Sequence, residues 1–277
     1  MQFRLTFSST MAFWLPYGTT AERRRVGAIK AMIFDLDGTL TPSKQVMLPE
    51  MARVFARLTR VLPTGVISGG SFRQFSHQLL EPLSSQDFSP QQLHLLPTCG
   101  TRYYLFEDGD WKAQYVLKMA PEQVQKARIV IEDVARSLGY WCEDPAGEII
   151  ENRGSQLTYS ALGQQAAREA KDAWDPSGVK RAELAARAGK LLPELTVLSG
   201  GSTSVDITMR GIDKAYGVEK FLARTALKPA EVLFVGDRLD PDGNDYPAVR
   251  TGVQTRATSG PWQTQEIIAQ VLAAVSS

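Results

Sequence analysis

The chain of 277 residues is long enough for one large domain or two modest ones, and its 43% hydrophobic and 22% charged residues are typical of a folded globular protein. Its 31 basic and 30 acidic residues give a net charge of +1 without a dense basic run, which argues against nucleic-acid binding. Cys99 and Cys142 lie far apart, so neither a disulfide framework nor a zinc site is indicated, and a reducing, cytoplasmic location is expected. No apolar run approaches the roughly 18 to 20 residues of a membrane-spanning helix.

Residues 1–30 differ in composition from the rest of the chain. No acid occurs before Glu22, and a short apolar patch at residues 11–16 is followed by a basic cluster at residues 23–25. An organelle transit peptide has a similar composition, whereas a secretory signal would carry its basic residues ahead of the apolar patch. We predict a poorly ordered N-terminal extension over residues 1–30, with the fold beginning near Lys30.

Apolar runs that end in polar, glycine-containing turns recur along the chain. The first covers residues 31–34 and leads into the motif DLDGTLT (35–41), after which a helix with one buried face is predicted. Two further runs, residues 65–68 and 232–235, lead into Gly-Gly and Gly-Asp turns, and residues 252–254 are a further candidate strand. In open parallel sheets ligands bind at the carboxyl ends of the strands, so these turns are expected to converge.

The middle of the chain has a different pattern. Residues 121–138 predict a long amphipathic helix, and two strand-like stretches, 148–159 and 195–209, are separated by helices at 164–174 and 179–192. We therefore predict an α/β fold, in which a Rossmann-like, doubly wound parallel sheet carries an inserted α+β cap. The predicted divisions are the extension at residues 1–30, a core domain at residues 31–113 plus 210–277, and a cap domain at residues 114–209.

The pair Asp35 and Asp37 stands directly after the first predicted strand. One such carboxylate can attack phosphorus and form an acyl phosphate, while the other can protonate the leaving oxygen and later activate the incoming nucleophile. The turn at Gly38 and Thr39 brings backbone N–H groups close to a bound phosphate. Two solvated acids in a loop are the alternative interpretation, but DLDGTLT after a buried strand favours catalysis.

An acid-rich segment, GDRLDPDGND (236–245), follows the last of the three apolar runs. Magnesium prefers oxygen ligands, typically one or two carboxylates with water and substrate phosphate, and Asp35 and Asp237 can supply two carboxylates. The segment lacks the closing Glu of an EF-hand calcium loop. Asp240 and Asp242, taken singly, are interpreted as residues of a surface loop.

Lys214 opens a predicted helix, and Ser68 ends the second predicted strand. A lysine beside several carboxylates and a phosphate offsets their repulsion and favours an ionised nucleophile. A hydroxyl at the end of a strand can donate a hydrogen bond to a phosphoryl oxygen. A surface lysine and a structural serine are the alternatives when each residue is considered alone.

In chain order, DLDGTLT, the strand ending in Ser68-Gly69-Gly70, Lys214 and GDRLDPDGND resemble the four motifs of the haloacid dehalogenase superfamily, whose members mostly transfer phosphoryl groups through an aspartyl phosphate. An insertion between the second and third motifs is similar to subclass IIB, which contains the eukaryotic phosphomannomutases and the Cof-type and sucrose-phosphate phosphatases. The resemblance covers roughly residues 31–270. It is strongest to the phosphomannomutases, in TPSKQ (41–45), ISGGSF (67–72), ENRG (151–154), SGGSTSVDI (199–207) and GIDK (211–214).

This resemblance implies roles for individual residues. Asp35 would be the nucleophile and Asp37 the general acid/base, and the other predicted catalytic residues are Ser68 and Lys214, which would contact phosphate. Magnesium would be held by Asp35, the carbonyl group of Asp37 and Asp237, supported by Asn244 and Asp245. The predicted substrate-binding residues are Thr39, Gly69, Lys44, Arg153 and Asp206, of which Asp206 would touch sugar hydroxyls.

The chain departs from the phosphomannomutase pattern where that family holds a second, non-reacting phosphate with cap arginines. Of these arginines only Arg153 is retained. Gln164 and Lys44 stand where the family pattern has arginines, and residues 145–147 contain no arginine where a further one is expected. Arginine binds phosphate in a bidentate manner, so a weaker hold on the second phosphate favours escape of the intermediate or attack by water. The candidates for that contact are Arg102, Arg153 and Arg210.

We therefore predict a Mg2+-dependent phosphatase that hydrolyses a sugar phosphate. A hexose phosphomutase, such as a phosphomannomutase, is the first alternative, and a non-catalytic protein that binds a phosphorylated ligand is a distant one. A phosphorylated small molecule is the predicted partner, without nucleic acid or membrane. Analogy to the phosphomannomutases predicts a homodimer formed through the caps.

Overall fold

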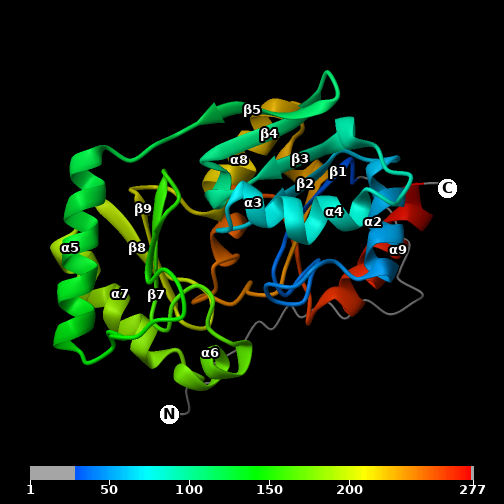
Figure 1. Ribbon diagram of the computed structural model, residues 1–277. Coiled ribbons are helices and arrows are strands. Elements are labelled where there is room, and N and C mark those ends of the chain that lie inside the picture. The colour runs from blue at the N-terminus through cyan, green and yellow to red at the C-terminus, as the bar shows by residue number, and fades with distance from the viewer. Residues whose placement is uncertain (1–28, 276–277) are drawn as a thin grey trace, which may run out of the picture.

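The computed structural model describes residues 29–275 (Figure 1). The predicted N-terminal extension therefore lies, apart from Ile29 and Lys30, outside the described residues. Within the described range the chain forms a seven-stranded and a four-stranded sheet, which Figure 1 shows in separate halves of the molecule. None of the helices in this range is long and apolar enough to cross a bilayer.

The larger sheet has the strand order β11-β10-β1-β2-β3-β4-β5. Strands β11 to β3 run parallel, and β4 and β5 extend the sheet as an antiparallel hairpin. The strands are β1 (Ala31–Asp35), β2 (Thr64–Ile67), β3 (Leu93–Leu96), β4 (Arg102–Glu107), β5 (Asp110–Val116), β10 (Val232–Gly236) and β11 (Gln254–Ala257). The predicted α/β fold with a parallel central sheet is confirmed.

Helices cover both faces of this sheet because alternate residues of a strand point to opposite sides. Met32 and Phe34 of β1 pack in one cluster with α2 (Pro49–Thr59) and α9 (Pro261–Val275). Ala31 and Ile33 pack in a second cluster with α8 (Lys214–Thr225). The connection after β2 is helical, and consists of α3 (Phe72–Phe75), a π-helical turn (Ser76–Leu80) and α4 (Glu81–Leu83).

The smaller sheet is antiparallel, with the order β6-β7-β9-β8. Its strands are β6 (Ile150–Asn152), β7 (Gln156–Ser160), β8 (Leu195–Ser199) and β9 (Ser204–Met209). Leu157 and Ile207 point to the face covered by α5 (Pro121–Ser137) and α7 (Val179–Leu191), and the short α6 (Arg168–Trp174) precedes α7. We refer to this sheet with α5, α6 and α7 as the cap.

Three predicted strands differ in detail from the structure. Each strand-like stretch of the cap is a hairpin of two strands, and the first of them turns at Gly154 with φ of +87°. The last strand begins at Gln254 instead of residue 252, because Gly252 has φ of +80° and ends a 3-10 helix (Tyr246–Thr251). The chain passes from the larger sheet to the cap between β5 and α5, and it returns between β9 and α8.

Candidate active site

The turns that follow three neighbouring parallel strands meet in one cleft, as predicted from the sequence. Asp35 ends β1, Ser68 follows β2 and Asp237 follows β10, and all three line a cleft of about 520 Å3. The other predicted site residues that line it are Asp37, Lys44, Gly69, Arg153, Asp206 and Asn244. Because Lys44 belongs to a loop after β1 while Arg153 and Asp206 belong to the cap, the cleft lies between the two sheets.

Lys214 lies buried behind this cleft, together with Asp245. Its Nζ donates hydrogen bonds of 2.5 Å to Asp35 Oδ1 and to Asp245 Oδ1, and the three side chains are at most 5% exposed. Lys214 is the first residue of α8, where the carboxylate of Asp213 caps the helix by accepting from the backbone N–H of Ala215 at 2.9 Å. The start of the helix thus fixes the position of the lysine.

The electrostatics of the cluster are governed by burial and by close like charges. Burial raises the pKa of Asp35 well above its usual range, and the Asp245 and Asp237 carboxylates raise it further while Lys214 opposes the shift. Burial and the charge of Asp245 also raise the pKa of Asp237. Burial alone would lower the pKa of Lys214, but the adjacent Asp245 and Asp35 carboxylates outweigh it and raise that pKa. One ammonium therefore faces three carboxylates.

The same three carboxylates fit a divalent cation. One oxygen each from Asp35, Asp237 and Asp245 lies within 4.8 Å of the other two. Small hard cations such as Mg2+ take oxygen ligands, and one such ion would relieve the repulsion that raises the carboxylate pKa values. Asn244 lines the cleft beside them, whereas the side chain of Asp37 is outside this cluster.

The carboxylate of Asp37 is held by the loop after β1 and by the π-helical turn, outside the acidic cluster. Its Oδ1 accepts a hydrogen bond from the backbone N–H of Lys44 at 2.5 Å and another from Gln78 Nε2 at 3.1 Å. The same Gln78 Nε2 also donates to the carbonyl of Gln45 at 3.1 Å. Gln78 was not predicted from the sequence, since it carries no motif and lies 41 residues from Asp37. Two fixed donors thus orient the second carboxylate of the predicted catalytic pair.

The turn after Asp37 requires glycine for two reasons. Gly38 has φ of +81°, and a Cβ atom placed there would lie 2.6 Å from Asp237 Oδ2. The neighbouring Thr39 is fully buried, and its Oγ1 donates to Asp237 Oδ1 at 3.4 Å. The substrate contact of Thr39 stays a prediction, and the contact that the structure gives this residue positions an acidic residue of the candidate metal site.

Replacing Gly38 with alanine is expected to weaken Mg2+ binding by about tenfold or more, because the new methyl group must displace the Asp237 carboxylate. The backbone strain of a left-handed alanine adds about 1–2 kcal/mol of destabilisation. Gly109→Ala is the matched control, since Gly109 has φ of +83° but nothing within 4 Å of its added methyl. Thermal unfolding titrated with Mg2+ measures both effects, and equal Mg2+ affinity in the two variants would contradict the expectation.

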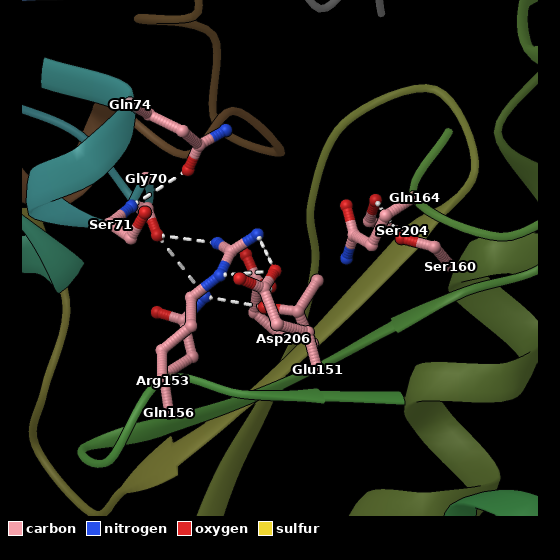
Figure 2. Close-up of polar contacts among 12 residues, drawn as sticks. Gly70, Ser71, Gln74, Glu151, Arg153, Gln156, Ser160, Gln164, Ser204 and Asp206 are labelled. Carbon is pink, nitrogen blue, oxygen red and sulfur yellow. Dashed lines mark hydrogen bonds and ion pairs between the residues drawn. The ribbon is translucent and has the colours of Figure 1, made fainter. Parts of the chain in front are cut away.

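On the cap side of the cleft, Arg153 is already paired within the protein. Its side chain is 8% exposed, and its guanidinium forms an ion pair of 2.6 Å with Glu151 and donates to the carbonyl of Gly69 at 2.8 Å (Figure 2). Gln156 Nε2 makes a longer contact of 3.4 Å with the same carbonyl. These bonds tie the β6–β7 hairpin to the loop that carries Ser68. The pairing with Glu151 was not predicted.

Other cap residues define the far wall of the cleft. Asp206 is half-buried and accepts from Thr158 Oγ1 at 2.7 Å, and desolvation by the surrounding protein raises its pKa. Arg181 also lines the cleft, where its Nε donates to Asp175 Oδ2 at 2.9 Å and its Nη1 donates to the carbonyl of Gly201 at 2.8 Å. Sequence analysis did not identify Arg181, whose position becomes significant only when α7 packs beside the loop before β9.

Two of the three arginines considered for a second phosphate lie outside the residues that line the cleft. Arg102 donates from Nη2 to the carbonyl of Arg153 at 2.7 Å, which places it behind the hairpin. Arg210 is exposed and bonds the carbonyl of Pro193. Only Arg153 of the three lines the cleft itself.

Known structures share this fold. A Plasmodium falciparum IMP-nucleotidase, in a C-terminally truncated form, superposes with a TM-score of 0.67 at 14% identity, covering 90% of this chain and 74% of that chain. A haloacid dehalogenase-like hydrolase from Bacteroides thetaiotaomicron superposes with a TM-score of 0.58 at 16% identity, covering 88% and 99%. At such identities the likeness establishes the fold alone, which is that of the haloacid dehalogenase superfamily.

Sequence comparison is more specific. The phosphomannomutase of Drosophila melanogaster is 28% identical over 268 residues, covering 92% of this chain and 99% of that protein. The phosphomannomutase of Spinacia oleracea is 28% identical over 226 residues, covering 77% and 84%. The family model of eukaryotic phosphomannomutase matches residues 51–274, well over half of the chain. With the fold and the acidic cleft, this match shows that the chain belongs to the eukaryotic phosphomannomutase family.

Proposed function

We propose that this protein transfers the phosphoryl group of a phosphorylated sugar to and from Asp35, with Mg2+, as a hexose phosphomutase. The observation that carries the proposal is the placement of Asp35 at the end of β1, in a cleft where Lys214, Asp237 and Asp245 surround it. The curated relatives named phosphomannomutases support the choice of a mutase over a hydrolase. We also propose residues 31–113 plus 210–277 as a core domain and residues 114–209 as a substrate-selecting cap.

In this proposal Asp35 attacks phosphorus and forms an aspartyl phosphate while the sugar oxygen leaves. Asp37 protonates that leaving oxygen and then takes the proton of the hydroxyl that attacks the aspartyl phosphate. Lys214 opposes the rise in the pKa of Asp35 and so favours its ionised form, and Lys44 N–H and Gln78 hold Asp37 in place. Bound Mg2+ would supply positive charge to the cluster of Asp35, Asp237 and Asp245 and to the phosphate.

Hydrolysis of a sugar phosphate is a second candidate, favoured by the state of the cap arginines. Arg153 is paired with Glu151 and Arg181 with Asp175, so neither guanidinium is free to clamp a second phosphate. A mutase must retain its bisphosphorylated intermediate while that intermediate reorients. A weaker hold would allow the intermediate to leave, after which water could attack the aspartyl phosphate.

One assay distinguishes the two candidates. The full-length protein is incubated with mannose and glucose monophosphates, with Mg2+ or with EDTA, and half of the samples contain a catalytic amount of hexose bisphosphate. We expect Mg2+-dependent isomerisation that the bisphosphate stimulates, with little free phosphate. Release of phosphate without isomerisation would establish the phosphatase instead. Activity that persists unchanged in EDTA would contradict the metal requirement of both candidates.

A further inference from the structure

Asp206, a half-buried residue of β9, has its two carboxylate oxygens in different surroundings. Its Oδ1 accepts a hydrogen bond of 2.7 Å from Thr158 Oγ1. Its Oδ2 lies 3.0 Å from the position that a Cβ on Gly200 would occupy and 3.5 Å from that of a Cβ on Gly69, and both glycines line the cleft. Because glycine has no side chain, both positions leave space beside Oδ2, on the side of the cleft.

Two residues on the same face of β7, Gln156 and Thr158, hold the carboxylate of Asp206 through hydrogen bonds. Their side chains are buried, at 1% and 2% exposure. Gln156 Nε2 donates to Thr158 Oγ1 at 2.9 Å, and the Thr158 hydroxyl donates in turn to Asp206. An ionised carboxylate can only accept, so the single hydroxyl proton of Thr158 goes to Asp206 and the hydroxyl oxygen accepts from Gln156. These requirements fix the orientation of the Gln156 amide.

The same amide connects Asp206 to the loop after β2, which carries Ser68. Gln156 Nε2 lies 3.4 Å from the carbonyl oxygen of Gly69, to which Arg153 Nη1 also donates at 2.8 Å. Figure 2 shows Gln156 and Arg153 between this loop and Asp206. Since Ser68 is a proposed phosphate contact, these bonds set the position of Asp206 relative to the phosphate.

The electrostatics of Asp206 are consistent with a role as a hydrogen-bond acceptor. Desolvation raises its pKa, but the positive charges of Arg153 and Lys44 and the hydrogen bonds from Thr158 and Gln156 oppose that rise. All four residues therefore favour the ionised form. An ionised carboxylate accepts a stronger hydrogen bond from a hydroxyl group than a neutral acceptor does.

We infer that Gln156 and Thr158 are positioning residues, which orient the Asp206 carboxylate toward a ring hydroxyl of the substrate. The inference rests on the proposed function, since it assumes that a phosphorylated sugar binds in the cleft. A carboxylate that rotates freely offers its oxygens in several directions, whereas the bond from Thr158 to Oδ1 restricts Oδ2 to one direction. The pair thereby selects sugars that present a hydroxyl at one position of the ring.

Binding of sugar phosphates that lack single hydroxyls tests this inference without turnover. The Asp35→Asn protein in Mg2+ is titrated calorimetrically with glucose 1-phosphate, with mannose 1-phosphate, and with the 2-deoxy, 3-deoxy and 4-deoxy forms of the tighter ligand. We expect loss of at least one hydroxyl to weaken binding by about tenfold, as loss of one charge-assisted hydrogen bond would. Binding that depends on none of these hydroxyls would overturn the inference alone. Absence of binding by every sugar phosphate would overturn the proposed function with it.

Adding Thr158→Val to the Asp35→Asn protein is expected to weaken binding of the parent sugar phosphate by about fivefold. Binding of the deoxy form that lacks the contacted hydroxyl should stay within twofold, because that ligand no longer depends on the orientation of Asp206. Valine has nearly the shape of threonine and lacks the hydroxyl. Thr158→Ser keeps the hydroxyl and should retain the affinity for the parent ligand, which separates the hydrogen bond from packing of the side chain.

Gln156→Met is expected to reduce the same difference between parent and deoxy ligands, which keeps the test valid if Thr158→Val does not fold. Thr196→Val is the matched control, because Thr196 is a half-buried threonine of β8 on the same face of the cap sheet, outside the residues that line the cleft. Equal weakening of parent and deoxy ligands by Thr158→Val would overturn the inference. So would a hydroxyl dependence that Thr158→Val and Gln156→Met both leave unchanged.

Discussion

Replacement of Asp35 with asparagine is expected to abolish phosphoryl transfer, by at least about a thousandfold in kcat, while the protein stays folded. Asparagine has nearly the same shape but lacks the anionic oxygen that forms the acyl phosphate, and loss of a nucleophile has effects of this size or greater. Burial already disfavours the charged form of Asp35, as its raised pKa indicates. Removal of that charge should therefore leave the free energy of unfolding equal or higher at neutral pH.

The measurement combines initial rates with thermal unfolding of the same preparations. Asp242→Asn is the matched control, since Asp242 is an exposed carboxylate of the same acid-rich segment and does not line the cleft. Its rate and unfolding temperature should equal those of the unaltered protein. Full turnover by Asp35→Asn would exclude Asp35 as the nucleophile, and a rate loss with an equally large loss of stability would indicate a structural role instead.

Replacement of Lys214 with methionine is expected to lower the free energy of unfolding by about 3–5 kcal/mol at neutral pH, because it removes one member of a buried ion pair. The carboxylates of Asp35 and Asp245 would remain buried without the ammonium that both now contact. Without Lys214, the pKa of Asp35 rises further, so the folded chain would bind a proton more tightly than the unfolded chain. The loss in the free energy of unfolding is therefore largest at neutral pH. It decreases as the pH falls toward about 4, which is the pKa of an aspartate in the unfolded chain.

Urea unfolding in EDTA between pH 7.5 and about 5 provides this measurement, with the unaltered protein compared at each pH to remove effects common to both. Lys126→Met is the control, because Lys126 is half exposed and its ion pair with Glu194 lies at the surface. Surface pairs contribute about 0–1 kcal/mol. A loss for Lys214→Met no larger than this, or a loss that does not change with pH, would show that the buried lysine does not balance the cluster.

Local patterns in the sequence were sufficient for the fold class and for one side of the site. A buried strand is a continuous apolar run, and the residues that follow it in a parallel sheet must emerge at the same edge. The convergence of Asp35, Ser68 and Asp237 follows from these facts, and the structure places all three in one cleft. The antiparallel β4–β5 hairpin was not predicted, although β4 contains an apolar run at residues 103–106. Its partner β5 has no such run and is partly exposed along its length.

The opposite side of the cleft could not be derived from local patterns. The sequence shows that Arg153 is present, but only the folded cap shows that Glu151 occupies its guanidinium. Gln78 contacts Asp37 across 41 residues, and Arg153 of the cap contacts the carbonyl of Gly69 across 84 residues.

The physical reason for this division is the separation along the chain between the residues that interact. Hydrophobic periodicity is a pattern of neighbouring residues within one helix or strand, so sequence by itself determined the α/β fold and the positions of the acidic turns. Ion pairing and desolvation depend on which side chains packing brings within a few ångströms, regardless of their separation along the chain. Tertiary structure alone therefore decided which cations of the cleft are paired with protein carboxylates, as Arg153 is with Glu151 and Arg181 is with Asp175.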